Sequence, residues 1–444
     1  MFSLEGSFGD KGLKFTRCAK TSLRCSDYPS QRDWEFLRWR GYTRNLKRTV
    51  NRPLPISSFW IHYLMQPLPI QFDPIELPPE VDSVRAKVRA FISREQHAFE
   101  PGSLMRHSPE FSRKCAEEGL IGMTWPEEFG GGGRSFLERY VVSEELLAAG
   151  APVWAHWVAD RQSGPILLRY GEPSVRKKIL PQIVRGECYF CIGMSEPDSG
   201  SDLFAANCKA QRTNEGWRVN GRKIWTSNAH RSHYMIALLR TSPATKDDRR
   251  HGLTQFLIDM SSPGIDVRPI VNMAGLHDFN EVVFDDVLVP PEHLIGEVDK
   301  AWTQASGELA YERSGPERFL ETIFVLYELI RAVGPSPDRA TAEGIGRLVA
   351  QLSTLRQLSV SVSGMLQAGR FPDVEAALVK ELSTNWAQLL PTKARELLPI
   401  EQVTPGSSFD VVLRQAMLVA PKLTIQGGTR EVLRGIIARG LGLR

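Results

Sequence analysis

Long apolar runs are absent from this 444-residue chain, and none approaches the roughly 20 residues that a membrane-spanning helix needs. Its six cysteines form no paired framework, which argues against a small disulfide-stabilised secreted domain. Cys188 and Cys191 form a C-x-x-C pattern, but neither a second pair nor a βαβ pattern accompanies them. We interpret them as two small apolar residues of a buried strand, against the alternative of a redox or metal pair. We therefore expect no metal site and a reducing, cytoplasmic setting.

Acidic residues are scarce only at the start of the chain. Residues 1–64 carry twelve Lys or Arg and five Asp or Glu, a balance of +7, whereas the remaining residues carry 43 and 46, a balance of −3. The basic character thus belongs to the first segment. The body of the chain gives no support for a nucleic-acid or membrane partner.

Regular periodicity is also missing from this first segment, which lacks the apolar core of a secretory signal. Its acidic residues argue against a mitochondrial transit peptide. We interpret residues 1–77 as an atypical N-terminal extension that is disordered or not native, with translation starting at Met65. A disordered or partly helical tail is the alternative. The mass of the protein from its natural host distinguishes the two.

The secondary structure that the sequence predicts changes twice along the rest of the chain. Residues 78–188 have helical spacing, with Val84, Val88, Phe91 and Ile92 on one face. Residues 189–298 have short β-rich runs between Gly and Asn turns, which favours a barrel or sandwich. Helical periodicity returns over residues 299–444. The pattern predicts an α+β protein with helices near residues 81–99, 136–149, 173–183, 302–329, 345–366, 375–390 and 429–441.

Two motifs in the middle region suggest a ligand site. Residues 194–202 read Met-Ser-Glu-Pro-Asp-Ser-Gly-Ser-Asp, and residues 220–228 read Asn-Gly-Arg-Lys-Ile-Trp-Thr-Ser-Asn. In a strand, Trp225 and Ser227 share a face. A flat isoalloxazine could stack on the ring and accept a hydrogen bond from the hydroxyl. A hairpin with a core tryptophan and an exposed serine is the alternative, and the order and spacing of the two motifs favour the ligand site.

These motifs resemble the middle domain of acyl-CoA dehydrogenases, with signatures Thr-Glu-Pro-x-x-Gly-Ser-Asp and Asn-Gly-x-Lys-x-Trp-Ile-Thr-Asn. The likeness continues at Gly119-Leu-Ile-Gly, at Pro126-Glu-Glu-Phe-Gly-Gly, at Asn280-Glu-Val-Val-Phe-Asp-Asp-Val and at Gly427-Gly-Thr-Arg-Glu-Val. It covers roughly residues 75 to 444. It implies an N-terminal helical domain (78–188), a middle β-barrel or sandwich domain that binds the flavin (189–298) and a C-terminal four-helix bundle (299–444).

The resemblance implies that the protein uses FAD to dehydrogenate an acyl-CoA thioester to the 2,3-enoyl-CoA, with hydride transfer to flavin N5. Ser201 is implied to contact the substrate as well as the cofactor. The cofactor contacts that the resemblance implies are Met194, Ser195, Ser201, Trp225, Ser227, Gln426, Gly428 and Thr429.

The reaction also needs a base for the α-proton. Many family members carry a glutamate directly before the Gly-Thr of the C-terminal motif, but here Gly427 occupies that position. A second group places the base directly before an arginine that contacts CoA, and this pattern matches Glu312 and Arg313. The resemblance therefore implies Glu312 as the base and Arg313 as a CoA contact. A solvated Glu–Arg pair on a helix face is the alternative.

The segments that bind the adenine half of FAD in relatives are poorly matched. An Arg-x-x-Phe-Gly segment lacks its phenylalanine near Arg331, and a glycine-rich stretch is mostly lost over residues 401–409. Pyrophosphate binding needs the close backbone approach that glycine permits. The chain could therefore be a half-site subunit of a mixed heterotetramer. A flavin-dependent monooxygenase on the same fold is a further alternative. It is less favoured, because such an enzyme needs no carboxylate base, whereas this chain carries Glu312 directly before Arg313.

The resemblance implies three kinds of partner: an acyl-CoA substrate, an electron-transfer flavoprotein, and either further copies of the chain or a second acyl-CoA dehydrogenase subunit in a tetramer. No residue type identifies the acyl group.

Overall fold

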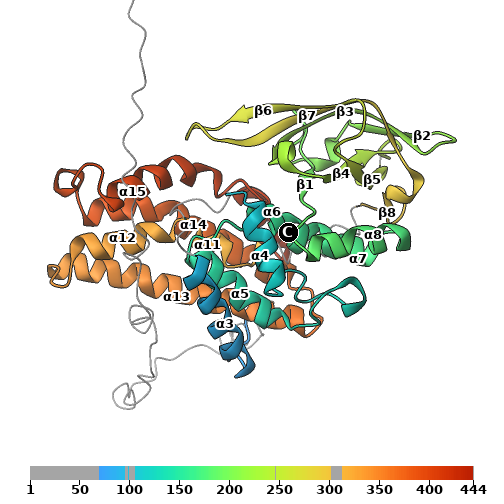
Figure 1. Ribbon diagram of the computed structural model, residues 1–444. Coiled ribbons are helices and arrows are strands. Elements are labelled where there is room, and N and C mark those ends of the chain that lie inside the picture. The colour runs from blue at the N-terminus through green and yellow to red at the C-terminus, as the bar shows by residue number, and fades with distance from the viewer. Residues whose placement is uncertain (1–69, 96–98, 100–105, 246, 302–312, 444) are drawn as a thin grey trace, which may run out of the picture. The chain divides into compact units, whose positions relative to one another are not determined.

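The computed structural model of the protein describes residues 70–95, 99, 106–245, 247–301 and 313–443 (Figure 1). Most of the expected extension, with Met65, lies outside these residues, and so does the candidate base Glu312. Residues 70–77, which the sequence analysis placed in the extension, form an extended segment. Within this segment Ile75 and Leu77 pack on a buried cluster that includes Val81 and Val360.

Helices form the region before the sheet, as the apolar spacing predicts. The first helix buries Val81, Val88, Phe91 and Ile92 on one face. Another begins with a capping box, in which the Ser135 hydroxyl and the Glu138 carboxylate satisfy each other's backbone N–H groups. The helices of this region are α3 (Glu80–Glu95), α4 (Pro109–Glu117), α5 (Phe136–Ala148), α6 (Trp154–Val158), α7 (Gly164–Tyr170) and α8 (Pro173–Val184).

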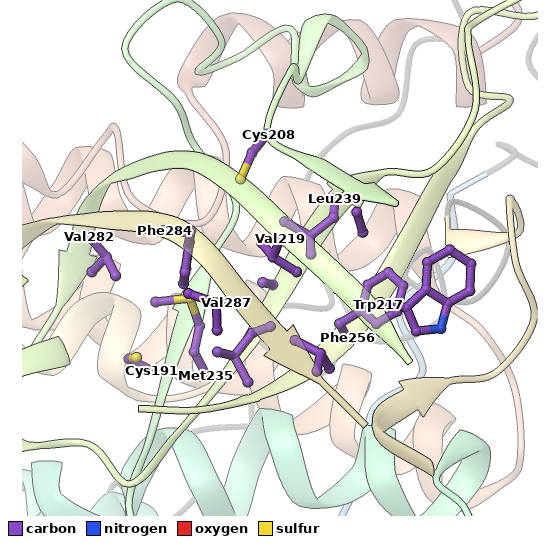
Figure 2. Close-up of a cluster of buried hydrophobic side chains, with 14 of the residues drawn as sticks. Cys191, Cys208, Trp217, Val219, Met235, Leu239, Phe256, Val282, Phe284 and Val287 are labelled. Atoms are coloured by element: carbon purple, nitrogen blue, oxygen red, sulfur yellow. The ribbon is translucent and has the colours of Figure 1, made fainter. Parts of the chain in front are cut away.

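A mixed β-sheet follows, in the order β6-β7-β3-β2-β4-β5-β8, with β1 pairing in parallel beside β4. Its strands curve around one apolar core (Figure 2), which includes Trp217, Phe256 and Phe284. The strands are β1 (Phe190–Gly193), β2 (Lys209–Arg212), β3 (Trp217–Ser227), β4 (Tyr234–Arg240), β5 (Leu253–Asp259), β6 (Ile265–Val271), β7 (His277–Val289) and β8 (Leu294–Ile295).

The C-x-x-C pair lies where the sequence placed it, in buried apolar surroundings. Cys191 belongs to β1, Cys188 lies two residues before that strand, and both are free and buried. Burial raises the pKa of both thiols to about 12, so they stay protonated. Within the described residues no group of three or more His, Cys, Asp or Glu side chains is placed to hold a metal.

Helices return after the sheet and pack on one another and on α5 (Figure 1). Arg356 of α13 and Glu144 of α5 form a bidentate ion pair, with contacts of 2.6 and 2.8 Å, that ties the two helical regions together. The helices are α11 (Glu317–Leu320), α12 (Ile323–Val333), α13 (Arg339–Gln367), α14 (Asp373–Leu397), α15 (Ser408–Val419) and α16 (Arg430–Gly440). Nowhere in the described ranges is there a helix both long and apolar enough to cross a membrane.

The helices of this region differ from the prediction in two places. Residues 302–312 of the expected helix over 302–329 lie outside the described residues, and its remainder is interrupted at Gly315 and Pro316, because proline has no N–H to continue the helical bonds, and again between α11 and α12. Helix α15 was not predicted, although Ser407 caps its start by accepting a hydrogen bond from the Asp410 backbone N–H.

Candidate flavin and acyl-CoA site

The first motif forms a tight turn at the end of β1. The backbones of Glu196 and Ser199 exchange hydrogen bonds of 2.8 and 3.1 Å, and the Ser199 hydroxyl donates to the Asp202 carbonyl. Ser201 is exposed on this turn, whereas Ser195 is half-buried. The side chain of Met194 packs underneath, on a cluster that includes buried Leu238 and Leu253. The turn therefore presents small polar groups above an apolar base.

A buried ion pair joins this turn to the second motif. The Lys223 side chain is fully buried, and its ammonium group lies 2.7 Å from Glu196 Oε1 and 3.1 Å from the Met194 carbonyl oxygen. Glu196 also accepts hydrogen bonds from the backbone N–H groups of Asn207 and Cys208. Sequence reasoning missed both roles, although each residue lies in a quoted motif and Lys223 falls on the core face of a strand, where an unpaired charge is rare.

A β-bulge in β3 turns Trp225 away from the core. Lys223 pairs with Val282 and Thr226 with Asn280, so three steps along β3 match two along β7. Trp225 has a φ of +60°, and its residue is 58% exposed. Without the extra residue, Trp225 would face the same side as buried Lys223, because strand faces alternate.

The two predicted ring contacts thus share a face. Thr226, between them, is buried, while Trp225 is exposed and Ser227 half-buried. The alternative of a core tryptophan is wrong, because the bulge shifts the alternation by one residue. The Trp225 and Phe279 rings lie edge to face, at 6.1 Å between centroids. Because more than half of Trp225 is exposed, its indole is accessible to a flat ligand, and the ring end of the site fits a flavin.

The C-terminal motif lies beside Arg313. A Cβ atom built on Gly428 would lie 3.8 Å from Arg313 Nη2, and the buried Arg313 precedes the break at Gly315. Thr429 caps α16 by accepting from the Val432 backbone N–H. The structure therefore brings together the segment with Gly427, where many relatives carry the base, and the arginine that follows Glu312.

Side chains from neighbouring helices hold this segment. Lys380 of α14 is fully buried and donates to the Gly428 carbonyl at 2.7 Å. The Gln426 amide donates to Glu321 at 3.2 Å. Gly427 and Gly428 have φ values of +70° and +103°, which a side chain rarely adopts. A glutamate at position 427 would therefore be strained in this backbone.

The segments expected near the adenine are engaged in local structure. Arg331 pairs with Glu328 at 2.6 Å, and Asp338 caps α13. Farther along, the Gly406 backbone N–H donates to the Asp410 carboxylate. These contacts are local to the helices of this chain, and the stretch over residues 401–409 lacks most of the glycines expected of a phosphate-binding loop.

Known proteins match this chain over most of its length. Three family models match it: "Acyl-CoA dehydrogenase, N-terminal domain" over residues 78–187, the "middle domain" of that family over 191–287 and its "C-terminal domain" over 333–442. Acyl-CoA dehydrogenase IpdE1 of Mycobacterium tuberculosis is 30% identical over 393 residues, which cover 82% of this chain and 98% of that protein. FadE34 of the same organism is 33% identical over 344 residues, covering 76% of this chain and 46% of that protein.

Solved structures are also similar to this chain over most of its length. The structure described as "Tcur3481-Tcur3483 steroid ACAD" has a TM-score of 0.74 at 25% identity, covering 84% of this chain and 98% of that one. The ChsE4-ChsE5 complex from Mycobacterium tuberculosis has a TM-score of 0.71 at 25% identity, covering 83% and 99%. Fold and matched domains together define a flavin-dependent oxidoreductase of lipid metabolism with an α+β fold. The chain belongs to the acyl-CoA dehydrogenase family.

Proposed function

We propose that this protein is an FAD-dependent acyl-CoA dehydrogenase that introduces an α,β double bond into an acyl-CoA thioester. The observation that carries the proposal is the exposed face shared by Trp225 and Ser227, set by the bulge in β3 beside the Met194–Asp202 turn. When bound, FAD accepts the hydride from the substrate β-carbon. Trp225 stacks on its ring, and the hydroxyls of Ser195 and Ser227 donate to ring atoms.

The remaining roles divide between substrate and cofactor. Ser201, exposed on the turn, contacts both cofactor and substrate. Gln426, Gly428 and Thr429 contribute the C-terminal side of the cofactor site. Arg313 binds the CoA portion, and its position beside Gly428 supports this role.

Glu312 is the proposed base. It takes the α-proton, which the thioester carbonyl acidifies, and a desolvated carboxylate suits that task because burial raises its pKa towards neutrality. Arg313, its neighbour in sequence, is buried, which supports a desolvated setting at this point of the chain. Glu317, the next carboxylate, is held in a buried ion pair with Arg161 at 2.8 Å and is not available as a base.

Replacing the base tests the proposal directly. We expect Glu312→Gln to keep bound FAD but to lose anaerobic flavin bleaching by acyl-CoA by about 100-fold or more, because general-base catalysis is worth that much. Glu308→Gln, which changes a carboxylate four positions earlier in sequence, is the matched control and should bleach like the wild type. Wild-type turnover by Glu312→Gln would refute the assignment.

A second candidate is a half-site subunit of a mixed tetramer. The glycines expected near the adenine half of FAD are mostly missing from residues 401–409, and Arg331 and Asp338 make local contacts within α12 and at the start of α13. Two of the similar structures are described by pairs of protein names, and one of these is described as a steroid ACAD. We therefore include bulky, steroid-like CoA esters among the substrates to be screened, beside straight and branched chains.

Electrons would pass from the reduced flavin to an electron-transfer flavoprotein. We place the reaction in the cytoplasm, and the free thiols at the four described cysteines are compatible with a reducing compartment.

A further inference from the structure

A buried asparagine lies directly behind the proposed ring contacts. Asn280 of β7 is fully buried, and its Nδ2 donates to the carbonyl oxygen of Thr226 at 3.0 Å. Thr226 is the residue between Trp225 and Ser227, and it pairs with Asn280 in the strand register. Asn280 therefore holds the backbone that presents both side chains.

Two histidines contact the other end of the Asn280 amide. His277 Nε2 lies 2.7 Å from Asn280 Oδ1, and His230 Nδ1 lies 3.2 Å from the same atom. The imidazole rings stack at 3.8 Å between centroids with an interplanar angle of 16°. Because Nδ2 donates to a carbonyl, Oδ1 can only accept, so both histidines must donate their N–H groups to it.

This arrangement favours a neutral His230 ring. A proton on His230 places a positive charge against the stacked His277 ring and close to Arg231. Burial, His277 and Arg231 lower the pKa of His230, in that order. Nearby His107 responds in the same sense: burial first, then Arg231 and His230, lowers its pKa to about 4.

Charged groups lie next to the stack. Asp278 directly follows His277; burial raises its pKa, whereas Lys422, Arg231 and a hydrogen bond from Asn272 lower it. Glu321, which also acts on Asp278, pairs with Lys422 at 2.9 Å. A cavity of about 510 Å³ borders Arg231, His277 and Asp278, which gives solvent access to the stack. The other charged or titratable groups that border this cavity are Glu95, Arg106, His107, Glu110 and Lys114, and His233 acts on His107.

We propose that Asn280 and the stacked His230–His277 pair are positioning residues for the Trp225–Ser227 segment, and that protonation of His230 releases this segment and weakens flavin binding. The flavin-binding part rests on the function proposed above, whereas the release of the segment is a property of the protein without cofactor.

The direction of the pH effect follows from the two states of His230. In the closed state, Asn280 holds the Trp225–Ser227 segment and the His230 ring is neutral. In the open state, the segment is released, and His230 takes up a proton once the pH falls below about 6.5, the ordinary histidine value. The closed state is thus fully favoured above pH 6.5. It loses up to about tenfold in its equilibrium per pH unit below that value, until the lowered pKa is reached.

Hydrogen exchange of the full-length protein without FAD tests the release. We expect amides of residues 224–228, corrected for the intrinsic exchange rate, to lose protection by up to about tenfold per unit between pH 6.5 and 5.5. Asn228 N–H, bonded to the Asp278 carbonyl at 2.8 Å, should report the change with them. Protection that is equal at pH 7.5 and 5.5 would overturn the proposal.

Variants separate positioning from general stability. His277→Gln retains an amide donor for Asn280 but removes the ring stacked on His230, so it should reduce the pH dependence, and a double change with His230→Asn should abolish it. Asn280→Leu should lose protection at pH 7.5 already. His251→Gln, at a half-buried histidine of the β4–β5 turn, is the control and should behave as wild type.

FAD titration of the same variants connects the segment to the cofactor. The apparent dissociation constant should rise below pH 6.5 in the wild type and stay level in the double variant. Binding with the same affinity at pH 7.5 and 5.5 overturns this inference alone. A wild-type chain that binds no FAD at any pH, alone or with a second subunit, overturns the proposed function and leaves the exchange result to decide the release.

Discussion

At the residue scale, the site depends on backbone geometry as much as on side-chain chemistry. Trp225 is presented by a left-handed conformation that a bulky residue adopts at a cost of roughly 1–2 kcal/mol. Asn228, three residues later, also lies in this region, at a φ of +52°. Strained residues of this kind persist where the surrounding contacts over-determine them. Here the Asn280 bond to the Thr226 carbonyl supplies such a contact.

Trp225 therefore allows flavin binding and stability to be separated. Asparagine tolerates the left-handed region, so Trp225→Asn should leave the midpoint of thermal unfolding unchanged or raise it by the equivalent of up to about 1 kcal/mol. FAD affinity should fall by about tenfold, because the stacked ring is lost. Calorimetry and flavin fluorescence measure the two effects. A variant that loses stability and affinity in parallel would contradict a mainly ligand-binding role.

The sequence singled out the proposed ring contacts because short motifs carry them. Trp225 and Ser227 are two positions apart, and both lie off the core face of β3. The reason given, simple alternation, was incomplete, because alternation alone would have buried Trp225 beside Lys223. The positioning role of Asn280 could not be predicted from sequence spacing, because its partners lie on different segments. Thr226 belongs to β3 and His277 to β7, and His230 follows β3.

At the element scale, the buried Lys223–Glu196 pair joins the Met194–Asp202 turn to β3. Its attraction offsets the cost of removing two charges from water only while both partners are present. The backbone also depends on it, because Ile224 N–H donates to the Ser195 carbonyl at 2.9 Å. The position of Ser195 relative to Trp225 thus follows from this connection.

Removing one partner of the Lys223–Glu196 pair should destabilise the protein more than removing both. We expect Glu196→Ala to lower the free energy of unfolding by about 3–5 kcal/mol, since it leaves a buried cation unpaired. Adding Lys223→Met should recover part of that loss, and the N–H groups of Asn207 and Cys208 account for the remainder. Urea unfolding of the three variants measures the coupling. Strictly additive losses would show that the two side chains act independently.

The helices also show what local patterns can and cannot predict. Helix α5 was predicted to within a residue, because its apolar residues recur at helical spacing, and the structure adds a capping box of Ser135 and Glu138 at its start. Helix α14 runs beyond the predicted end at residue 390 and through Pro391 to Leu397. Packing of its apolar face against neighbouring helices maintains it despite the missing N–H, a tertiary effect that propensity does not contain.

At the scale of the whole molecule, the open question is how many chains complete one FAD site. The proposed ring contacts all belong to this chain, whereas the segments that the resemblance places near the adenine lack most of their glycines. Leu389 of α14 and Ile425, in the turn before α16, are exposed apolar residues.

The flavin content of the purified protein and the mass of its complex test how many chains complete one FAD site. A complete homo-oligomeric enzyme should be yellow when purified alone, with about one FAD per chain. A half-site subunit should be colourless or substoichiometric and become yellow when produced with a second acyl-CoA dehydrogenase subunit. Native mass spectrometry counts chains and flavins in each case. One FAD per chain in a complex of this chain alone would rule out the half-site candidate.

The sequence by itself determined the family, the three-part organisation and the residues of the flavin-ring motifs, because these depend on local periodicity and on short contiguous segments. The tertiary structure alone decided that Trp225 leaves the core, that Lys223 and Glu196 bury a charge pair, and that Arg313 lies beside Gly428. Each of these depends on a strand register or on packing between segments far apart in the chain. The physical reason is that one extra residue in β3, seen only against β7, inverts which side chains face the core.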